Sequence, residues 1–176
     1  MNQIPQSISE LTLVATPSAV AWARRHTVNV LRRWRFSAEA IEVARLLVSG
    51  LTTNAIQHTK LTETSETAAV ESARPGTIVL SLWPTDGGIV LAVSDPDPRP
   101  PLARTDDASA TGGRGLILVQ AMASRWGYYQ PGRRAGKVVW AEVLAHPSAA
   151  VGESGAGHPQ SVRVIIRRVL TGLREL

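Results

Sequence analysis

Three small or polar residues recur at helical spacing in the stretch LLVSGLTTNAIQHTK, residues 46–60. Gly50, Asn54 and His58 are four residues apart and therefore share one side of a helix. An interior glycine costs a helix about 1 kcal/mol relative to alanine. Asn54 offers a neutral oxygen ligand suited to Mg²⁺, although an isolated Asn is also common at helix surfaces and ends. The stretch is either a helix end or a polar face with a function.

Two further segments carry residues suited to binding a nucleotide. In TGGRGL, residues 111–116, three glycines precede a predicted helix. Glycines let the backbone approach a phosphate, and a helix N-terminus presents free N–H groups to it; a flexible loop with an N-cap is the alternative. Asp95 ends the apolar run VLAVSD. Its carboxylate could accept a hydrogen bond from an exocyclic amine, or simply begin a turn.

Helices and strands that would position these residues follow from the apolar pattern. Residues 9–15 alternate as a strand does, and Pro17 begins a helix that runs to Arg35. Ser37 caps a second helix, predicted to end at Thr59 and followed by a loop over 60–75. A hairpin turns at Asp86, a helix covers 116–126, and strands cover 127–130 and 137–143. This order predicts helices on one face of a largely antiparallel sheet.

Composition excludes several classes of protein. The chain of 176 residues is 44% hydrophobic, has no cysteine and carries a formal net charge of +5. No apolar run is long enough for a membrane span, and the N-terminus lacks the pattern of a signal peptide. We therefore expect a cytoplasmic protein that does not associate with a membrane. The arginines are scattered and no helix-turn-helix pattern occurs, so nucleic-acid binding is not favoured.

Taken together and in this order, the motifs resemble those of the histidine-kinase-like ATPase superfamily, whose ATP-binding domain has the Bergerat fold. LTTNAIQHT resembles its N box, VSDPDPRPP its first glycine box, and GGRGLILVQAMASRWGYY with GKVVWAEV its second. The chain is most similar to the anti-sigma-factor serine/threonine kinases, especially their small actinobacterial relatives. The resemblance implies an α+β two-layer sandwich with helices on one face of a mostly antiparallel mixed sheet.

The resemblance also implies a ligand and the residues that bind it. ATP with Mg²⁺ would be the cofactor, Asn54 would hold the metal, and Asp95 would read the adenine amino group. Residues 98–111 would form the lid. The phosphates would be bound by the glycine turn and the start of the next helix, namely Gly112, Gly113, Arg114, Gly115 and Leu116.

The sequence departs from the family pattern at two positions. Kinases of this type usually carry Glu, the general base, one turn before the N-box Asn, and here that position is Gly50. General-base help is worth about 10²–10⁴-fold in rate. Val138 stands where relatives often have a Thr that supports the adenine. His58 could replace the base, although a histidine near a helix C-terminus more often bonds a backbone carbonyl.

These departures favour a regulator that binds ATP and controls a protein partner, a sigma factor or an anti-sigma antagonist, by binding it. The alternative is an active serine/threonine kinase that phosphorylates the antagonist, so the enzyme class stays open. A DNA-associated regulator is a third and weaker option.

Three regions are expected along the chain: an ATP-binding domain over 9–145, a linker over 146–160, and an amphipathic basic segment over 161–176. In that last segment Val162, Ile166, Val169, Leu173 and Leu176 recur at four and three, with arginines around them. The β-branched run VRVII also suits a strand. So short a helix needs a surface to pack on, either its own domain, a second copy in a homodimer, or a partner.

Overall fold

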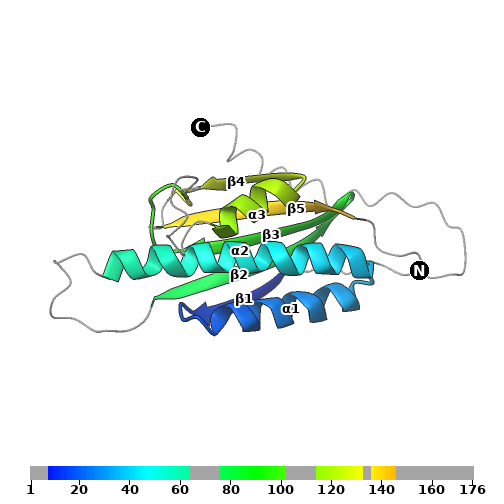
Figure 1. Ribbon diagram of the computed structural model, residues 1–176, viewed down its shortest axis with the longest axis horizontal. Helices are drawn as coiled ribbons and strands as arrows, with labels where there is room; N and C mark the ends of the chain where they lie inside the picture. The colour runs from blue at the N-terminus through cyan, green and yellow to red at the C-terminus, as the bar shows by residue number, and fades with distance from the viewer. Residues whose placement is uncertain (1–7, 64–75, 102–113, 133–135, 146–176) are drawn as a thin grey trace, which may run out of the picture.

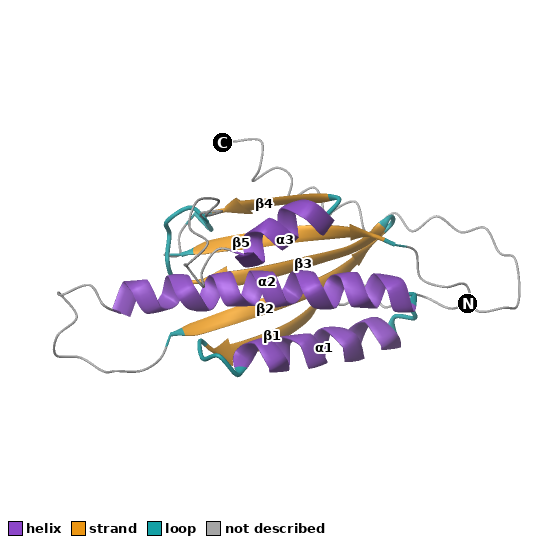
Figure 2. Cartoon of the chain, in the orientation of Figure 1, coloured by secondary structure: helices purple, strands orange, loops and turns teal. Residues whose placement is uncertain are grey.

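Three helices lie side by side on one face of a five-stranded sheet (Figure 1, Figure 2). This computed structural model describes residues 8–63, 76–101, 114–132 and 136–145. The helices are α1 (Ala19–Arg33), α2 (Ala38–Glu63) and α3 (Arg114–Met122). The strands are β1 (Ser9–Val14), β2 (Thr77–Thr85), β3 (Gly88–Asp95), β4 (Arg125–Tyr129) and β5 (Lys137–Leu144).

The strand order is β1-β2-β3-β5-β4, and each neighbouring pair is antiparallel. The hairpin predicted around Asp86 joins β2 to β3, with Thr85 opposite Gly88. β5 then returns beside β3, which places Lys137 opposite Asp95. The predicted α+β class with helices on one face of the sheet is confirmed.

The main core lies between α2 and the sheet. The apolar stripe of α2 is buried, with Ala44, Leu47, Val48 and Leu51 fully so. Burial of one large apolar side chain contributes about 1.5–3 kcal/mol, so this stripe fixes the rotation of α2 about its own axis. A second, smaller cluster lies on the other face of the sheet and is formed by Val90, Ala92 and Trp140, with Trp83, Tyr129 and Val138 packed against them.

Two element ends differ from the sequence prediction. α2 continues to Glu63, so the loop expected from residue 60 begins later. α3 ends at Met122 rather than at residue 126. The reason is pairing with β5: the Ser124 backbone N–H donates to the Glu142 carbonyl at 2.9 Å, and β4 begins at the next residue.

Some predictions fall outside the described residues: the linker over 146–160, the basic segment over 161–176, and most of the lid. Among the helices that are described, none combines the length and apolar character needed to cross a bilayer.

Candidate functional site

One side of α2 carries the polar residues singled out in the sequence. Ser37 fixes the start of this helix, because its Oγ accepts the Ala40 backbone N–H at 3.2 Å. From that start, Gly50, Asn54 and His58 follow at one-turn intervals. Gly50 is buried, Asn54 is 7% exposed, and His58 is partly buried. The side therefore runs from a contact with α3 at Gly50 to a contact with the end of β3 at His58.

At the first of these contacts two glycines meet. A Cβ atom on Gly50 would lie 2.5 Å from the Gly115 carbonyl oxygen, and one on Gly115 would lie 2.7 Å from the Gly50 carbonyl oxygen. Real Cβ atoms do not approach backbone so closely. The missing side chains therefore let the first turn of α3 rest directly on the middle of α2.

At the other contact, Asp95 forms a buried ion pair with a lysine. Lys137 Nζ donates to Asp95 Oδ1 at 2.9 Å and to the Asp97 carbonyl at 3.1 Å, and neither side chain of the ion pair is exposed. Gly136 has φ of 116°, a backbone conformation that residues with side chains rarely adopt, and a Cβ atom there would clash with the Asp95 carbonyl oxygen. This turn sets Lys137 at the start of β5, directly beside Asp95.

Asp97 joins β3 to α2. Its Oδ2 lies 3.1 Å from His58 Nδ1 and 2.8 Å from an Arg99 guanidinium nitrogen. Burial opposes ionisation of Asp97, but the bonds from Arg99 and His58 outweigh it and hold its pKa well below the usual value. For Asp95, burial raises the pKa and the bond from Lys137 offsets part of the rise. The pKa is thus raised at Asp95 and lowered at the neighbouring Asp97.

The site offers polar atoms that nothing in the described chain satisfies. Asp95 Oδ1 already accepts bonds from Lys137 and from the Asp97 backbone N–H at 3.0 Å, whereas the buried Oδ2 has no partner. Asn54 Nδ2 is likewise buried without a partner. An unpaired buried carboxylate oxygen complements an N–H donor such as the adenine amino group. The arrangement thus fits a ligand that brings donors to Asp95.

For a metal ion, the described residues offer little beyond Asn54. They contain no group of three or more His, Cys, Asp or Glu side chains arranged to hold one. Mg²⁺ is often bound by one or two protein groups together with phosphates and waters. Asn54 therefore suits a metal that arrives with a nucleotide, rather than a resident structural ion.

The other predicted binding residues are placed as follows. Gly115 belongs to the glycine contact, and the Leu116 side chain is buried in the main core. Arg114 is described only as the first residue of α3. Gly112 and Gly113 lie outside the described residues.

The structure corrects one interpretation and shows one further contact. Val138 packs in the second cluster, on the sheet face away from the helices, so it does not support an adenine. The neighbouring Lys137 points to the site instead, because strand side chains alternate between faces. His58 pairs with the Asp97 carboxylate, an interaction that the sequence pattern does not predict.

Comparison with known proteins decides the family. A model of the histidine kinase-like ATPase domain matches residues 13–143, most of the chain. The chain belongs to this family. The matched region includes the candidate site residues named above: the glycine contact, Asn54, and the carboxylates at and just after the end of β3.

Two similar proteins are informative in different ways. The uncharacterized protein SCO4941 of Streptomyces coelicolor is 44% identical over 62 residues, which span 34% of this chain and 58% of that relative. The crystal structure of the RsbU and RsbW domains of Rv1364c from Mycobacterium tuberculosis has 18% identity and a TM-score of 0.55, covering 84% of this chain and 35% of that one. At this identity the second likeness shows a shared fold.

Proposed function

We propose that this protein is an ATP-binding regulator of the anti-sigma-factor type, which controls a protein partner by binding it rather than by phosphorylating it. The observation that carries the proposal is the buried carboxylate of Asp95, whose Oδ2 has no partner in the described chain. Leaving such a group unsatisfied costs about 1–3 kcal/mol or more. A ligand that donates an N–H to it recovers that free energy.

The resemblance to the ATPase family supports a role for each candidate site residue. Asp95 would accept a hydrogen bond from the adenine amino group. Asn54 of α2 would bind Mg²⁺ through its amide oxygen. Gly112, Gly113, Arg114 and Gly115 would surround the phosphates, with the N-terminus of α3 directed at them. The metal would neutralise phosphate charge, and the protein would supply the position of the nucleotide.

The contact between Gly50 and Gly115 supports a binding role over phosphotransfer. A carboxylate base at position 50 would need the space that the Gly115 backbone fills. His58 is a poor substitute, because it lies about 12 Å along the helix axis from Gly50. It is also paired with Asp97, next to the carboxylate assigned to adenine. An active serine/threonine kinase therefore stays the second candidate.

The partner class comes from the resemblance to anti-sigma-factor kinases and from the shared fold with the RsbW-containing structure. A sigma factor or an anti-sigma antagonist domain, in the cytoplasm, is the partner that this branch implies. Regulation of transcription would then follow from sequestration, with ATP as a ligand that shapes the binding surface.

Calorimetric titration tests whether the protein binds ATP. ATP with Mg²⁺ should bind, and Asp95→Asn should weaken binding by about tenfold or more, since a charge-assisted bond contributes about 1.5–3 kcal/mol. Asp86→Asn, at the exposed hairpin turn, is the matched control and should bind as the wild type does. Absence of heat at millimolar ATP from folded wild-type protein would refute the nucleotide role.

Transfer of labelled phosphate tests the second half of the proposal. Purified protein with ATP and an antagonist-type domain should form a complex, detectable by size-exclusion chromatography, yet label the partner at no more than trace level. Robust labelling that survives His58→Ala would instead establish the kinase alternative.

A further inference from the structure

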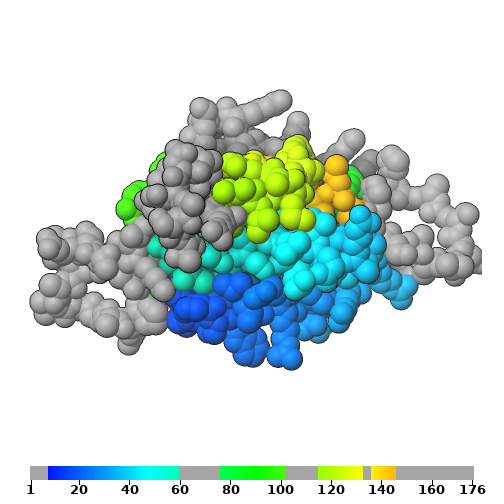
Figure 3. All heavy atoms as spheres, viewed as in Figure 1, coloured from blue at the N-terminus to red at the C-terminus, as the bar shows by residue number. Residues whose placement is uncertain are grey.

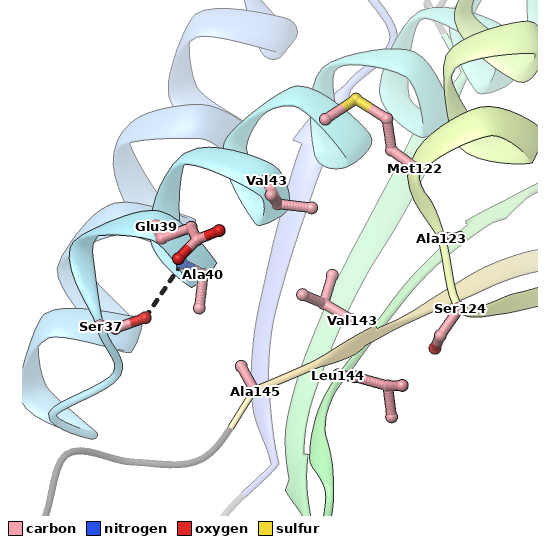
Figure 4. Close-up of a pocket in the computed structure, with 10 residues that line it drawn as sticks. All are labelled: Ser37, Glu39, Ala40, Val43, Met122, Ala123, Ser124, Val143, Leu144 and Ala145. Carbon is pink, nitrogen blue, oxygen red and sulfur yellow. Dashed lines mark hydrogen bonds between the residues drawn. The ribbon is translucent and has the colours of Figure 1, made fainter.

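A groove lies at the other end of α2 from His58. It has a volume of about 450 Å³ and is formed by the start of α2, the end of α3 and the end of β5 (Figure 4). Its lining consists of Ser37, Glu39, Ala40, Val43, Met122, Ala123, Ser124, Val143, Leu144 and Ala145. None of the proposed nucleotide-binding residues belongs to it.

The groove arises from the way in which α2 and α3 diverge. The helices touch at Gly50 and Gly115. From that contact α3 slants away from the first half of α2 (Figure 1). Both helices lie on the face of the molecule shown in Figure 3. Val43 and Met122 then form opposite walls, and Val143 of β5 lies between them (Figure 4).

Its lining is mixed: seven residues are apolar and three are polar, of which one is acidic. The Ser37 hydroxyl caps α2, and the Ser124 hydroxyl donates to the Glu142 carbonyl, so both are already engaged. Glu39 is the one charged residue in the lining. Leu144 is 69% exposed at the edge. A small polar ligand would need several convergent polar groups, whereas this groove suits an apolar stripe with positive charge beside it.

We propose that the occupant is residues 161–176 of the same chain. That segment combines apolar residues at intervals of three and four with arginines at 163, 167, 168 and 174. The apolar residues of the segment complement the apolar side chains of the groove, and its arginines complement the acidic Glu39. An amphipathic segment of this length needs such a surface to fold on.

The connection within the chain makes this occupant favourable. The described chain leaves the sheet at Leu144 and Ala145, both of which line the groove. Residues 146–160 can span at most roughly 50 Å when extended, which is ample for a return to the same site. A tether of this length gives an effective concentration on the order of millimolar, so even a weak contact is occupied.

Photo-crosslinking of the full chain tests the location. A benzophenone amino acid at Leu144 should crosslink to residues 161–176 within one chain, as mapped by mass spectrometry of the monomer band. The same group at Trp22, an exposed apolar residue of α1 outside the groove, is the matched control and should not. Crosslinks only between chains, or none to 161–176, would overturn the proposal in favour of a second copy or an external partner.

Limited trypsin digestion tests the energetics without truncating the chain. Cleavage tracks the undocked population, so a segment docked nine-tenths of the time is cut about tenfold more slowly than a free one. Leu144→Lys should raise the rate of cleavage at Arg163, Arg167 and Arg168 by roughly fivefold or more, because it removes apolar surface and repels the arginines. Trp22→Lys should leave it unchanged. Equal rates in wild type and Leu144→Lys would refute docking at this groove.

Discussion

At the scale of single residues, Lys137 supplies the positive charge that balances Asp95. It places a cation 2.9 Å from Asp95 inside the protein, where neither side chain is exposed to solvent. Removing one member of a buried pair leaves the other charge uncompensated, which typically costs about 3–5 kcal/mol. The electrostatic effect of His58 also lowers the pKa of Asp95. Lys137 therefore lowers the pKa of the Asp95 carboxyl against the rise caused by burial, which favours the ionised form that presents Oδ2 as an acceptor.

Lys137→Met should shift the pH dependence of ATP binding. Burial already raises the pKa of Asp95, and loss of the cation should raise it further. Binding that needs the carboxylate should then strengthen with rising pH, with a midpoint higher than in the wild type. Conversely, the folded protein should lose stability as pH rises through that pKa, because the ionised form is disfavoured in the fold. Calorimetry and melting curves from pH 5 to 8 measure both effects.

The control for this experiment is the double variant Lys137→Met with Asp95→Asn, which removes both charges and should lose the added pH dependence. His58 and Asp97 are unchanged in both variants, so the comparison isolates the effect of Asp95 and Lys137. An unchanged midpoint in Lys137→Met would contradict the role assigned to Lys137.

Residues that are unusual for their element are predictable from sequence, and residues that look ordinary are not. Gly50 and Asn54 stand out within a helix, and Asp95 stands out at a strand end. Lys137 follows a glycine at the start of a strand, where an exposed lysine is commonplace. The alternation of Lys137 with Val139 and Ala141 contains the missing signal, since those residues face the helices.

At the scale of elements, the contact between α2 and α3 is held by backbone rather than by side chains. Gly50 and Gly115 approach so closely that either gaining a Cβ requires the helices to move apart. The first turn of α3, which would face the phosphates, is thus positioned by the middle of α2. The sequence predicts the glycine-before-helix pattern, but not that one glycine rests on the other, because that contact depends on tertiary packing.

Gly50→Ala should destabilise the protein despite the better helix propensity of alanine. Alanine gains about 1 kcal/mol in a helix, whereas forcing extra atoms into a packed contact costs about 1–3 kcal/mol. We expect a net loss of stability in chemical denaturation. Gly132→Ala is the matched control, since a Cβ there has open space around it. A stabilised Gly50→Ala protein would mean that α3 yields without penalty.

Gly50→Glu, the change that restores the residue typical of kinases, should not restore phosphotransfer. Its side chain would displace the start of α3 and with it the proposed phosphate site. ATP affinity should fall together with stability, as measured by calorimetry and denaturation. Recovery of kinase activity in a stable Gly50→Glu protein would show that α3 can shift to make room for a base.

At the scale of the whole molecule, the site depends on non-consecutive strands. β5 inserts beside β3, and this pairing brings Lys137 to Asp95 across more than forty residues. The order of helices and strands along the chain is predictable from periodicity and turn residues. The strand order in the sheet is not, because pairing over such separations depends on long-range contacts that no local pattern records.

Adenine nucleotides should stabilise the whole domain, because α2, α3 and the end of β3 would all contribute to the proposed site. A ligand at one hundred times its dissociation constant adds about 2.7 kcal/mol, which for a domain of this size raises the melting temperature by roughly 5 to 10 °C. GTP should give a much smaller shift, since guanine presents a carbonyl oxygen where adenine presents its amino group to Asp95. Differential scanning calorimetry with ATP, GTP and ATP plus EDTA measures the three cases. EDTA should reduce the shift by removing the Mg²⁺ proposed to bind Asn54. Equal shifts from ATP and GTP would show that Asp95 does not read the base, even if a nucleotide binds.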